Sequence, residues 1–235
     1  MKKTFLFLAL ASITIISCRK DHEEIVPEVS IETQNSYDDE SAQKFLETHA
    51  FDAKGNLKEY VATDSTQVKL ASLNPITLPS GVIYLVRPNA QPIPGTEIGS
   101  TDILHLMSNT MTYVATNTND NVAFTSPYTF RNNIAGLGVP EIDPAYYYVK
   151  QSVLDNATTE LAKQRSFYEI EGFQEGLKHF KAFNIPDEDN YNLQGIIIVP
   201  SRAAFARDAH FNYINISFKD RSFVFNFQVY KTTPR

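Results

Sequence analysis

Residues 168–180 read YEIEGFQEGLKHF, and their apolar side chains recur at helical spacing. The apolar stripe consists of Ile170, Phe173, Leu177 and Phe180. Such a stripe is the pattern of a short amphipathic helix. Acidic residues stand near its start and basic residues near its end, the order that the helix dipole favours. We therefore expect a short helix here, with one apolar face that needs a partner.

Two predicted strands further along the chain supply that partner. Residues 196–199 are three isoleucines and a valine, and Pro200, which cannot donate to a sheet ladder, ends the run. In residues 223–230 the side chains alternate with a period of two, so that Phe223, Phe225 and Phe227 share one sheet face. The helix stripe is expected to pack on this phenylalanine face.

These three runs resemble the FKBP-type peptidyl-prolyl cis-trans isomerases. That family has a Gly-Trp-x-x-Gly-Leu helix, an Ile-Pro-x-x-x-Ala-Tyr-Gly segment and a terminal Leu-Val-Phe-Asp-Val-x-Leu strand. Residues 170–177, 199–206 and 223–229 follow the same order and spacing. The resemblance implies an α+β, FKBP-like fold, in which a curved antiparallel β-sheet wraps around a short α-helix. It also implies prolyl isomerisation that assists the folding of exported proteins.

The resemblance further implies an aromatic pocket that binds proline. Its lining residues would be Phe124, Ile170, Phe173, Phe205 and Phe225. Three positions depart from the family, because a polar side chain is replaced: Leu106 and Phe205 stand for tyrosines and Thr125 for a carboxylate. Phe173 replaces the tryptophan that forms the pocket floor.

The expected chemistry requires little from a protein. The barrier to rotation about a peptide bond is ~18–20 kcal/mol, and an apolar pocket that prefers the twisted amide lowers it without a nucleophile, cofactor or metal. The five histidines show no ligand-pair spacing, so no metal is expected. Each missing hydrogen-bond donor costs such a site about 10²-fold or more. Two functions therefore stay open: an isomerase, or a catalytically degenerate module that binds peptides or proteins as a scaffold.

The amino terminus has the features of a bacterial lipoprotein. Residues 1–17 combine a basic start with a short apolar run and predict an export signal. Cys18, the only cysteine, follows Ser17 as in a lipobox and is the expected lipidation site. The charged residues 19–24 loosely resemble a surface-export signal of Bacteroidetes lipoproteins, although a solvated tether has the same composition. We expect a lipid-anchored envelope protein at the outer membrane, facing the periplasm or the cell surface.

The remaining chain divides into a tether and a domain. Residues 18–80 are expected to form a lipidated tether with a short docking helix at residues 42–50, and residues 81–231 the FKBP-like domain. Strands are expected at residues 82–86 and 102–107. Residues 127–165 are longer than the family requires and form an insertion. We expect it to lie along the pocket rim, with decoration of a distant surface as the alternative.

Two features suggest that this insertion is ordered. Its predicted helix, residues 152–163, places Val153, Ala157 and Leu161 on one stripe. Three tyrosines at residues 146–148 bring large apolar area with polar tips, as contact surfaces often do. Residues 132–140, by contrast, have the composition of a loop.

Charge restricts the partners. The formal net charge is −6, and loss of the signal, which removes Lys2 and Lys3 and no acidic residue, makes it −8. Nucleic acid is therefore not expected as a partner. Proline-containing polypeptides, envelope proteins and, through the lipid, a membrane are the expected partners.

Overall fold

The computed structural model describes residues 28–136 and 138–235. The predicted export signal, Cys18 and the charged residues after it lie outside the described residues. Within the described ranges, no helix is long and apolar enough to cross a membrane.

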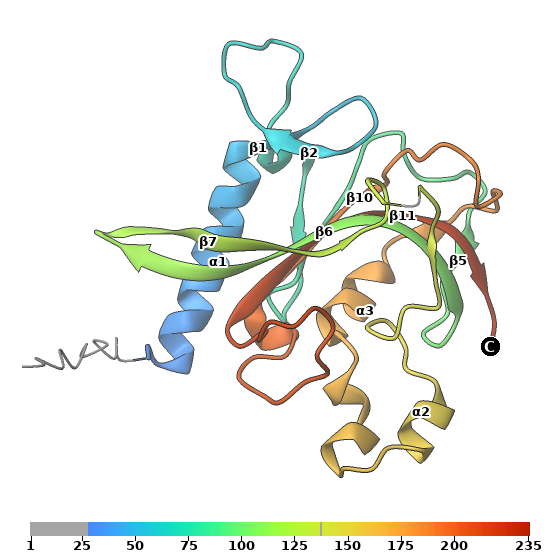
Figure 1. The fold of residues 1–235 in the computed structure, drawn as a ribbon. Coiled ribbons are helices and arrows are strands. Elements are labelled where there is room, and N and C mark those ends of the chain that lie inside the picture. The colour runs from blue at the N-terminus through green and yellow to red at the C-terminus, as the bar shows by residue number, and fades with distance from the viewer. Residues whose placement is uncertain (1–27, 137) are drawn as a thin grey trace, which may run out of the picture.

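The described chain is a mixed α/β structure built on antiparallel sheets (Figure 1). The α-helices are α1 (Ile31–Thr48), α2 (Gln151–Asp155) and α3 (Glu171–Leu177), and the 3₁₀ turns are η1 (Leu70–Leu73), η2 (Leu161–Lys163), η3 (Arg165–Phe167) and η4 (Ser201–Ala203). The strands are β1 (His49–Phe51), β2 (Leu57–Glu59), β3 (Ile76–Thr77), β4 (Ile83–Val86), β5 (Thr96–Glu97), β6 (Ile103–Thr118), β7 (Asn121–Asn132), β8 (Glu141–Ile142), β9 (Lys181–Ala182), β10 (Gly195–Val199) and β11 (Arg221–Thr233).

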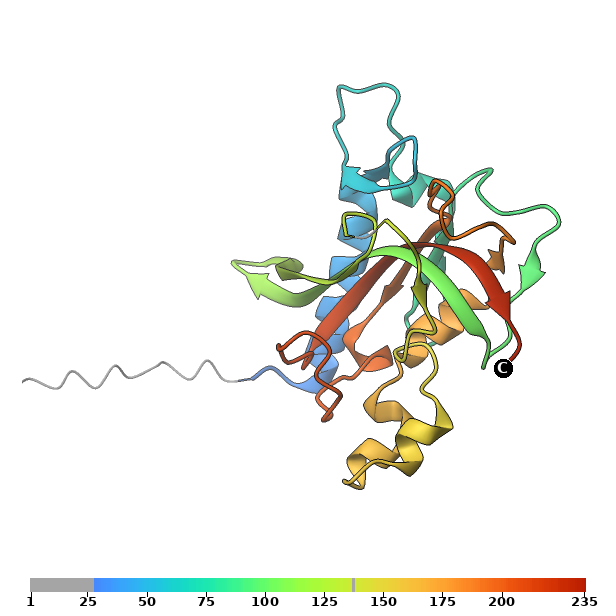
Figure 2. The ribbon, with the colours of Figure 1, turned by 45° about the vertical axis from the view of Figure 1, so that its right-hand side comes forward.

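One large sheet organises the chain. Its strand order is β3-β4-β10-β11-β6-β7, with β8 paired to the beginning of β6. Every neighbouring pair is antiparallel, and Phe225 lies opposite Ile197 on β10 and Thr110 on β6. Two small two-stranded sheets, β1-β2 and β5-β9, lie outside it. Strand β6 is much longer than the strand expected at residues 102–107, and with β7 it forms a hairpin that projects from the sheet (Figures 1 and 2).

Helix α3 packs on one face of this sheet, as the sequence predicts. Phe173 and Leu177 of α3 join the phenylalanines of β11 in one buried cluster. The two helix glycines make close packing possible, because a Cβ added at Gly172 would lie 2.5 Å from Val199 Cγ1, and one added at Gly176 2.7 Å from Ile197 Cγ2. The strand at residues 196–199 and the alternation in residues 223–229 are confirmed, and the helix expected in residues 168–180 is present over its central part, Glu171–Leu177.

Helix α1 covers the opposite face of the sheet (Figures 1 and 2). It begins at Ile31 after Ser30, whose Oγ accepts a hydrogen bond from Thr33 N–H (3.1 Å) as an N-cap. Its buried residues are Gln34, Asp38, Ser41, Ala42, Phe45 and Leu46. The short docking helix expected at residues 42–50 is therefore only the end of an 18-residue helix that forms a layer of the structure.

Polar contacts hold α1 against the chain after β10. The buried carboxylate of Asp38 accepts hydrogen bonds from Gln34 Nε2 (3.0 Å) and from the Ser201 N–H (2.8 Å). Arg202 Nη2 pairs with Asp39 Oδ1 at 2.7 Å, and its Nη1 donates to Asn35 O at 3.3 Å. These contacts tie α1 to the segment that contains Phe205.

The predicted helix at residues 152–163 is wrong. Helix α2 ends at Asp155, where Asn156 Nδ2 donates to Ser152 O (2.7 Å) and competes with the backbone ladder. Val153 and Leu161 are 42% and 51% exposed, so the stripe faces solvent rather than the protein. The tyrosine run behaves differently, because Tyr146 and Tyr147 are buried against the α3 cluster.

Candidate functional site

Four of the five predicted pocket residues lie together in the buried cluster between α3 and the sheet. They are Ile170, Phe173, Phe205 and Phe225. The rings of Phe173 and Phe225 stack with centroids 4.1 Å apart, and both side chains are inaccessible to solvent. Phe205 is 3% exposed and stacks on Phe218 at 5.7 Å. These rings pack on one another and form a core.

Phe124 does not join the other four residues. It lies on the α1 face of the sheet, with its ring 6.1 Å from Phe45 and 5.2 Å from Tyr113. The register of β6 and β7 shifts once between Thr125 and Tyr128, and a second shift, between Thr129 and Arg131, includes Phe130 itself. Because one extra residue in a strand moves the following side chains to the other face, the first shift separates the face of Phe124 from that of the residues after it. The prediction that Phe124 borders the pocket is therefore wrong.

Phe130 and Tyr146 pack against Phe173 and Phe225. The Tyr146 ring lies 5.1 Å from Phe130, 6.0 Å from Phe173 and 6.1 Å from Phe225. A backbone hydrogen bond also joins the two segments, because Ile170 N–H donates to Tyr146 O at 2.8 Å. Burial, together with the nearby Glu141 carboxylate, raises the pKa of the Tyr146 phenol well above its ordinary value. Tyr146 is thus a neutral core residue whose hydroxyl donates to Glu141 Oε2 (3.0 Å).

Arg131 covers this aromatic cluster on its outer side. Its guanidinium carbon lies 4.7 Å from the Phe130 ring centroid, 5.3 Å from Tyr213 and 5.6 Å from Tyr146. Its Nε also pairs with Glu141 Oε2 at 3.5 Å. Cation–π contacts of this kind contribute about 0.5–2 kcal/mol each. Sequence reasoning missed Arg131, because neither its spacing nor its neighbours distinguish it from a surface arginine.

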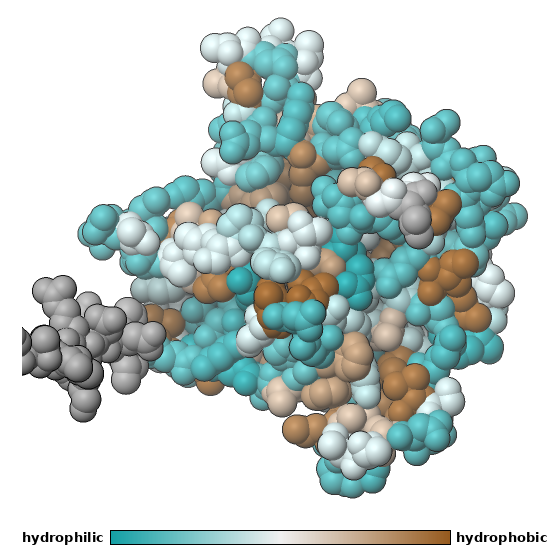
Figure 3. Space-filling view, viewed as in Figure 1, coloured by the Kyte–Doolittle hydropathy of each residue, from teal (hydrophilic) through white to brown (hydrophobic). Residues whose placement is uncertain are grey.

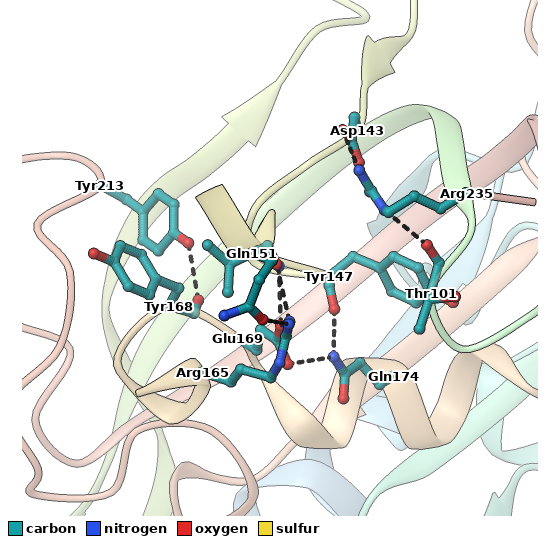
Figure 4. A network of polar contacts seen from close by, with 11 residues as sticks. Thr101, Asp143, Tyr147, Gln151, Arg165, Tyr168, Glu169, Gln174, Tyr213 and Arg235 are labelled. Atoms are coloured by element: carbon teal, nitrogen blue, oxygen red, sulfur yellow. Dashed lines mark hydrogen bonds and ion pairs between the residues drawn. The ribbon is translucent and has the colours of Figure 1, made fainter. Parts of the chain in front are cut away.

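A polar network fastens residues 147–165 to α3 (Figure 4). The buried Glu169 carboxylate accepts from Val149 N–H (2.9 Å), from Arg165 Nη1 (2.9 Å) and from Gln174 Nε2 (3.0 Å). Gln174 also donates to the carbonyl of Tyr147, whose hydroxyl donates to Gly99 O at 2.6 Å. Burial raises the pKa of Tyr147 to about 12, so this phenol stays protonated. The network holds Tyr147 in the core.

The remaining positions where the family has polar pocket residues play structural roles. Leu106 is fully buried in the α3 cluster, where its side chain offers no hydrogen bond. Thr125 Oγ1 donates to Val114 O (3.1 Å) and lies 3.2 Å from Thr116 Oγ1, so it serves the β6–β7 hairpin.

A cleft of about 440 Å³ opens beside the buried cluster. Residues 161–171, which lead into the start of α3, form one wall, and residues 202–209, including Phe205, form the other. Phe211 N–H donates to Phe167 O at 2.7 Å and joins the two walls. In the space-filling view, hydrophobic residues interrupt the hydrophilic surface over the lower part of the molecule (Figure 3). In the part of the chain that the structure describes, no group of three His, Cys, Asp or Glu residues could hold a metal.

Among known proteins, the chain shows distant structural similarity to two solved structures. No protein-family model matches the chain, and no curated protein does. The crystal structure of FkpA from Escherichia coli is similar with a TM-score of 0.37 and 19% identity, over 68% of this chain and 52% of that one. A peptidyl-prolyl cis-trans isomerase from Pseudomonas syringae pv. tomato has a TM-score of 0.35 and 10% identity, over 88% of this chain and 99% of that one. The chain thus spans about half of FkpA, and at these TM-scores neither likeness assigns a function.

Proposed function

We propose that this protein is a polypeptide-binding module of FKBP-like architecture that does not catalyse prolyl isomerisation. The proposal rests on one observation: the residues expected to line a proline pocket are packed against one another. Ile170, Phe173 and Phe225 have no solvent exposure, and Tyr146 packs beside them. A close-packed interior has few voids larger than a water molecule, so a prolyl ring has no place among these side chains.

The geometry also lacks what would stabilise a twisted amide. An isomerase must surround the rotating bond with apolar surface and offer donors to its carbonyl oxygens. The Ile170 N–H, which faces this region, already donates to Tyr146 O. Phe205 and Leu106 carry no hydroxyl, and Arg131 is held over three aromatic rings. Opening the cluster would separate the Phe173 and Phe225 rings, whose burial stabilises the fold.

A prolyl isomerisation assay tests the proposal. The chain from residue 20 onward contains every described helix and strand and is the form to use. The substrate is either a proline peptide in a protease-coupled assay or a protein whose refolding is limited by prolyl isomerisation. We expect that micromolar concentrations of the chain do not accelerate the isomerisation in either assay. Acceleration above the uncatalysed rate that disappears in a folded Phe173→Ala variant would overturn the proposal, because it would show a working aromatic pocket at α3.

The location of the module is a further part of the proposal. We infer that Cys18 is acylated after removal of residues 1–17 and that the module is anchored in a Gram-negative cell envelope, at the outer membrane. Its binding partners there are proline-containing polypeptides or other envelope proteins. Metabolic labelling with a palmitate analogue is expected to label the parent chain and to leave a Cys18→Ala variant unlabelled. Equal labelling of both chains would exclude Cys18 as the anchor.

A further inference from the structure

Residues 206–220 form a loop between η4 and β11, and its two ends are joined to each other. They contain no helix or strand. Asp220 N–H donates to Ala206 O at 2.8 Å, and Arg207 Nε pairs with Asp220 Oδ1 at 2.8 Å. We call this segment the 206–220 loop. Its ends are fixed without any contribution from the residues in its middle.

A histidine in the 206–220 loop packs on two buried aromatic rings. The His210 ring centroid lies 4.9 Å from that of Phe205 and 5.0 Å from that of Phe218. Phe205 is 3% exposed and Phe218 is inaccessible to solvent, whereas His210 itself is half-buried. His210 therefore covers two rings that belong to the α3 cluster.

The hydrogen bonds of His210 determine where its proton lies. Phe218 N–H donates to His210 Nε2 at 3.0 Å, and His210 Nδ1 lies 3.0 Å from the backbone oxygen of Asp208. A backbone N–H can only donate and a backbone carbonyl can only accept. Nε2 must therefore carry a lone pair and Nδ1 the proton. In this conformation the ring is a neutral imidazole with both nitrogens in use.

The charged groups around His210 make their pairs elsewhere. No ion pair of the described residues contains His210, whereas His105 pairs with Asp187 at 2.9 Å. Within the loop, Arg207 pairs with Asp220, and Lys219 with Glu28. The other charged residues near it, on the walls of the adjoining cleft, are Asp208, Glu169, Glu171 and Arg202. A positive charge on His210 would thus have no paired carboxylate at its present position.

Protonation of His210 is incompatible with this arrangement. An imidazolium has two donors and no acceptor, so the Phe218 N–H would lose its partner and face another donor. The charge would also lie against two apolar rings, where it loses hydration. Neutral His210 therefore stabilises the closed loop. This stabilisation is present above the pH range in which histidine titrates, near ~6.5, and is lost as the pH falls through that range.

We propose that His210 is a pH-sensitive closure of the 206–220 loop. At neutral pH the ring covers Phe205 and Phe218, and in acid the protonated ring turns into solvent and uncovers them. Phe205 also lines the cleft of about 440 Å³, so the change alters one wall of that cleft. The inference goes beyond the proposed function and does not depend on it.

The change is local, because other contacts of the loop do not involve His210. Phe211 N–H donates to Phe167 O at 2.7 Å, and the Tyr213 hydroxyl donates to Tyr168 O at 2.8 Å. None of these groups titrates in the histidine range, so both contacts persist when His210 is protonated.

Nuclear magnetic resonance of the ¹⁵N-labelled chain from residue 20 onward tests the proposal. At neutral pH, the ring nitrogens of His210 are expected to show a protonated Nδ1 and an unprotonated Nε2. The hydrogen-exchange protection factor of the Phe218 amide, which is corrected for the intrinsic pH dependence of exchange, is then followed toward pH 5. It is expected to fall about tenfold, the effect of one unit of difference in proton affinity. The amides of Phe211 and Asp220 are expected to keep their protection.

Three variants assign the effect to His210. His210→Gln retains a side-chain oxygen that accepts a hydrogen bond but does not titrate, so protection of the Phe218 amide should not depend on pH. His210→Phe retains the aromatic contact without an acceptor, and protection of this amide should be low at every pH. The matched control is His179→Gln, which removes an exposed histidine stacked on Tyr84 at 4.0 Å and should leave the response of the parent chain unchanged.

Four results would overturn the proposal. They are a constant protection factor for the Phe218 amide in the parent chain, an equal fall in His210→Gln, an equal fall for Phe211 and Asp220, and a proton on Nε2 at neutral pH. None of these results bears on the prolyl isomerisation assay, so this inference and the proposed function fail independently.

Discussion

The two faces of the large sheet are covered by helices that are held in different ways. On one face, α3 buries aromatic and aliphatic side chains at regular spacing against the phenylalanines of β11. On the other, α1 buries Gln34, Asp38 and Ser41 together with Phe45 and Leu46. The α3 face is held mainly by non-directional apolar packing. The α1 face depends in part on specific hydrogen bonds, such as that from the Ser201 N–H to Asp38.

This difference determines what each face tolerates. Apolar packing loses stability in proportion to the volume that a substitution removes. A buried polar contact loses stability when one partner is removed and the other is left without a hydrogen bond. Substitutions on the two faces of the sheet therefore measure these two kinds of stability loss separately.

The largest effect is expected on the α3 face. Phe173→Ala removes a fully buried ring that stacks on Phe225, and it should lower the free energy of unfolding by about 3–5 kcal/mol. Phe124→Ala, at a half-buried position on the α1 face, should cost distinctly less. Urea unfolding followed by circular dichroism measures both. Equal losses would contradict the placement of the two rings.

The second effect is expected at the buried carboxylate of α1. Asp38→Ala leaves the Ser201 N–H and Gln34 Nε2 without this acceptor, so it should lower the free energy of unfolding by about 1–3 kcal/mol. Its neighbour Asp39 makes a partly exposed ion pair with Arg202, and Asp39→Ala should cost about 0–1 kcal/mol. Urea unfolding of both variants gives the comparison, and a larger loss for Asp39→Ala would show that α1 is not held as described.

The pH dependence of stability should show a smaller effect with a defined sign. Burial raises the pKa of Asp38 in the folded state, although hydrogen bonds from Ser201 and Gln34 oppose the shift. The folded chain therefore binds the Asp38 proton more tightly than the unfolded chain, and this site destabilises the fold as pH rises from ~4, the ordinary aspartate value, through its folded pKa.

An Asp38→Asn variant, which has no such proton, isolates this contribution. The free energy of unfolding of the parent minus that of the variant should increase as pH falls from 8 toward 4 and become constant below that. Parallel pH profiles for the two chains would be inconsistent with a raised pKa at Asp38.

The smallest effect is expected on the exposed surface of residues 153–161. Val153→Ser and Leu161→Ser replace exposed side chains and should change the free energy of unfolding by no more than about 0.5 kcal/mol. Leu154→Ala, between them in the chain, removes a buried side chain and should cost about 2 kcal/mol or more. Thermal unfolding compares the three. A large loss of stability on substitution of Val153 or Leu161 would show that these side chains are buried, as the helical stripe in the sequence predicted.

The candidate site was predictable only in part. The family resemblance grouped Ile170, Phe173, Phe205 and Phe225, and these four side chains do lie in one buried cluster. Phe124 was misplaced because the register shift between Thr125 and Tyr128, which changes the face of the following side chains, has no counterpart in hydrophobic alternation.

The sequence alone determined helix α3 and strands β10 and β11, because each has its own period and an apolar stripe that must be buried. Only the tertiary structure decided three features: the length of α1, the packing of Tyr146 against the α3 cluster, and the ion pair of Arg202 with Asp39. Each of these depends on polar contacts between segments far apart in the chain: Asp38 with Ser201, Tyr146 with Ile170, and Arg202 with Asp39. A hydrogen bond between distant residues leaves no local periodicity, and so it becomes visible only when the chain has folded.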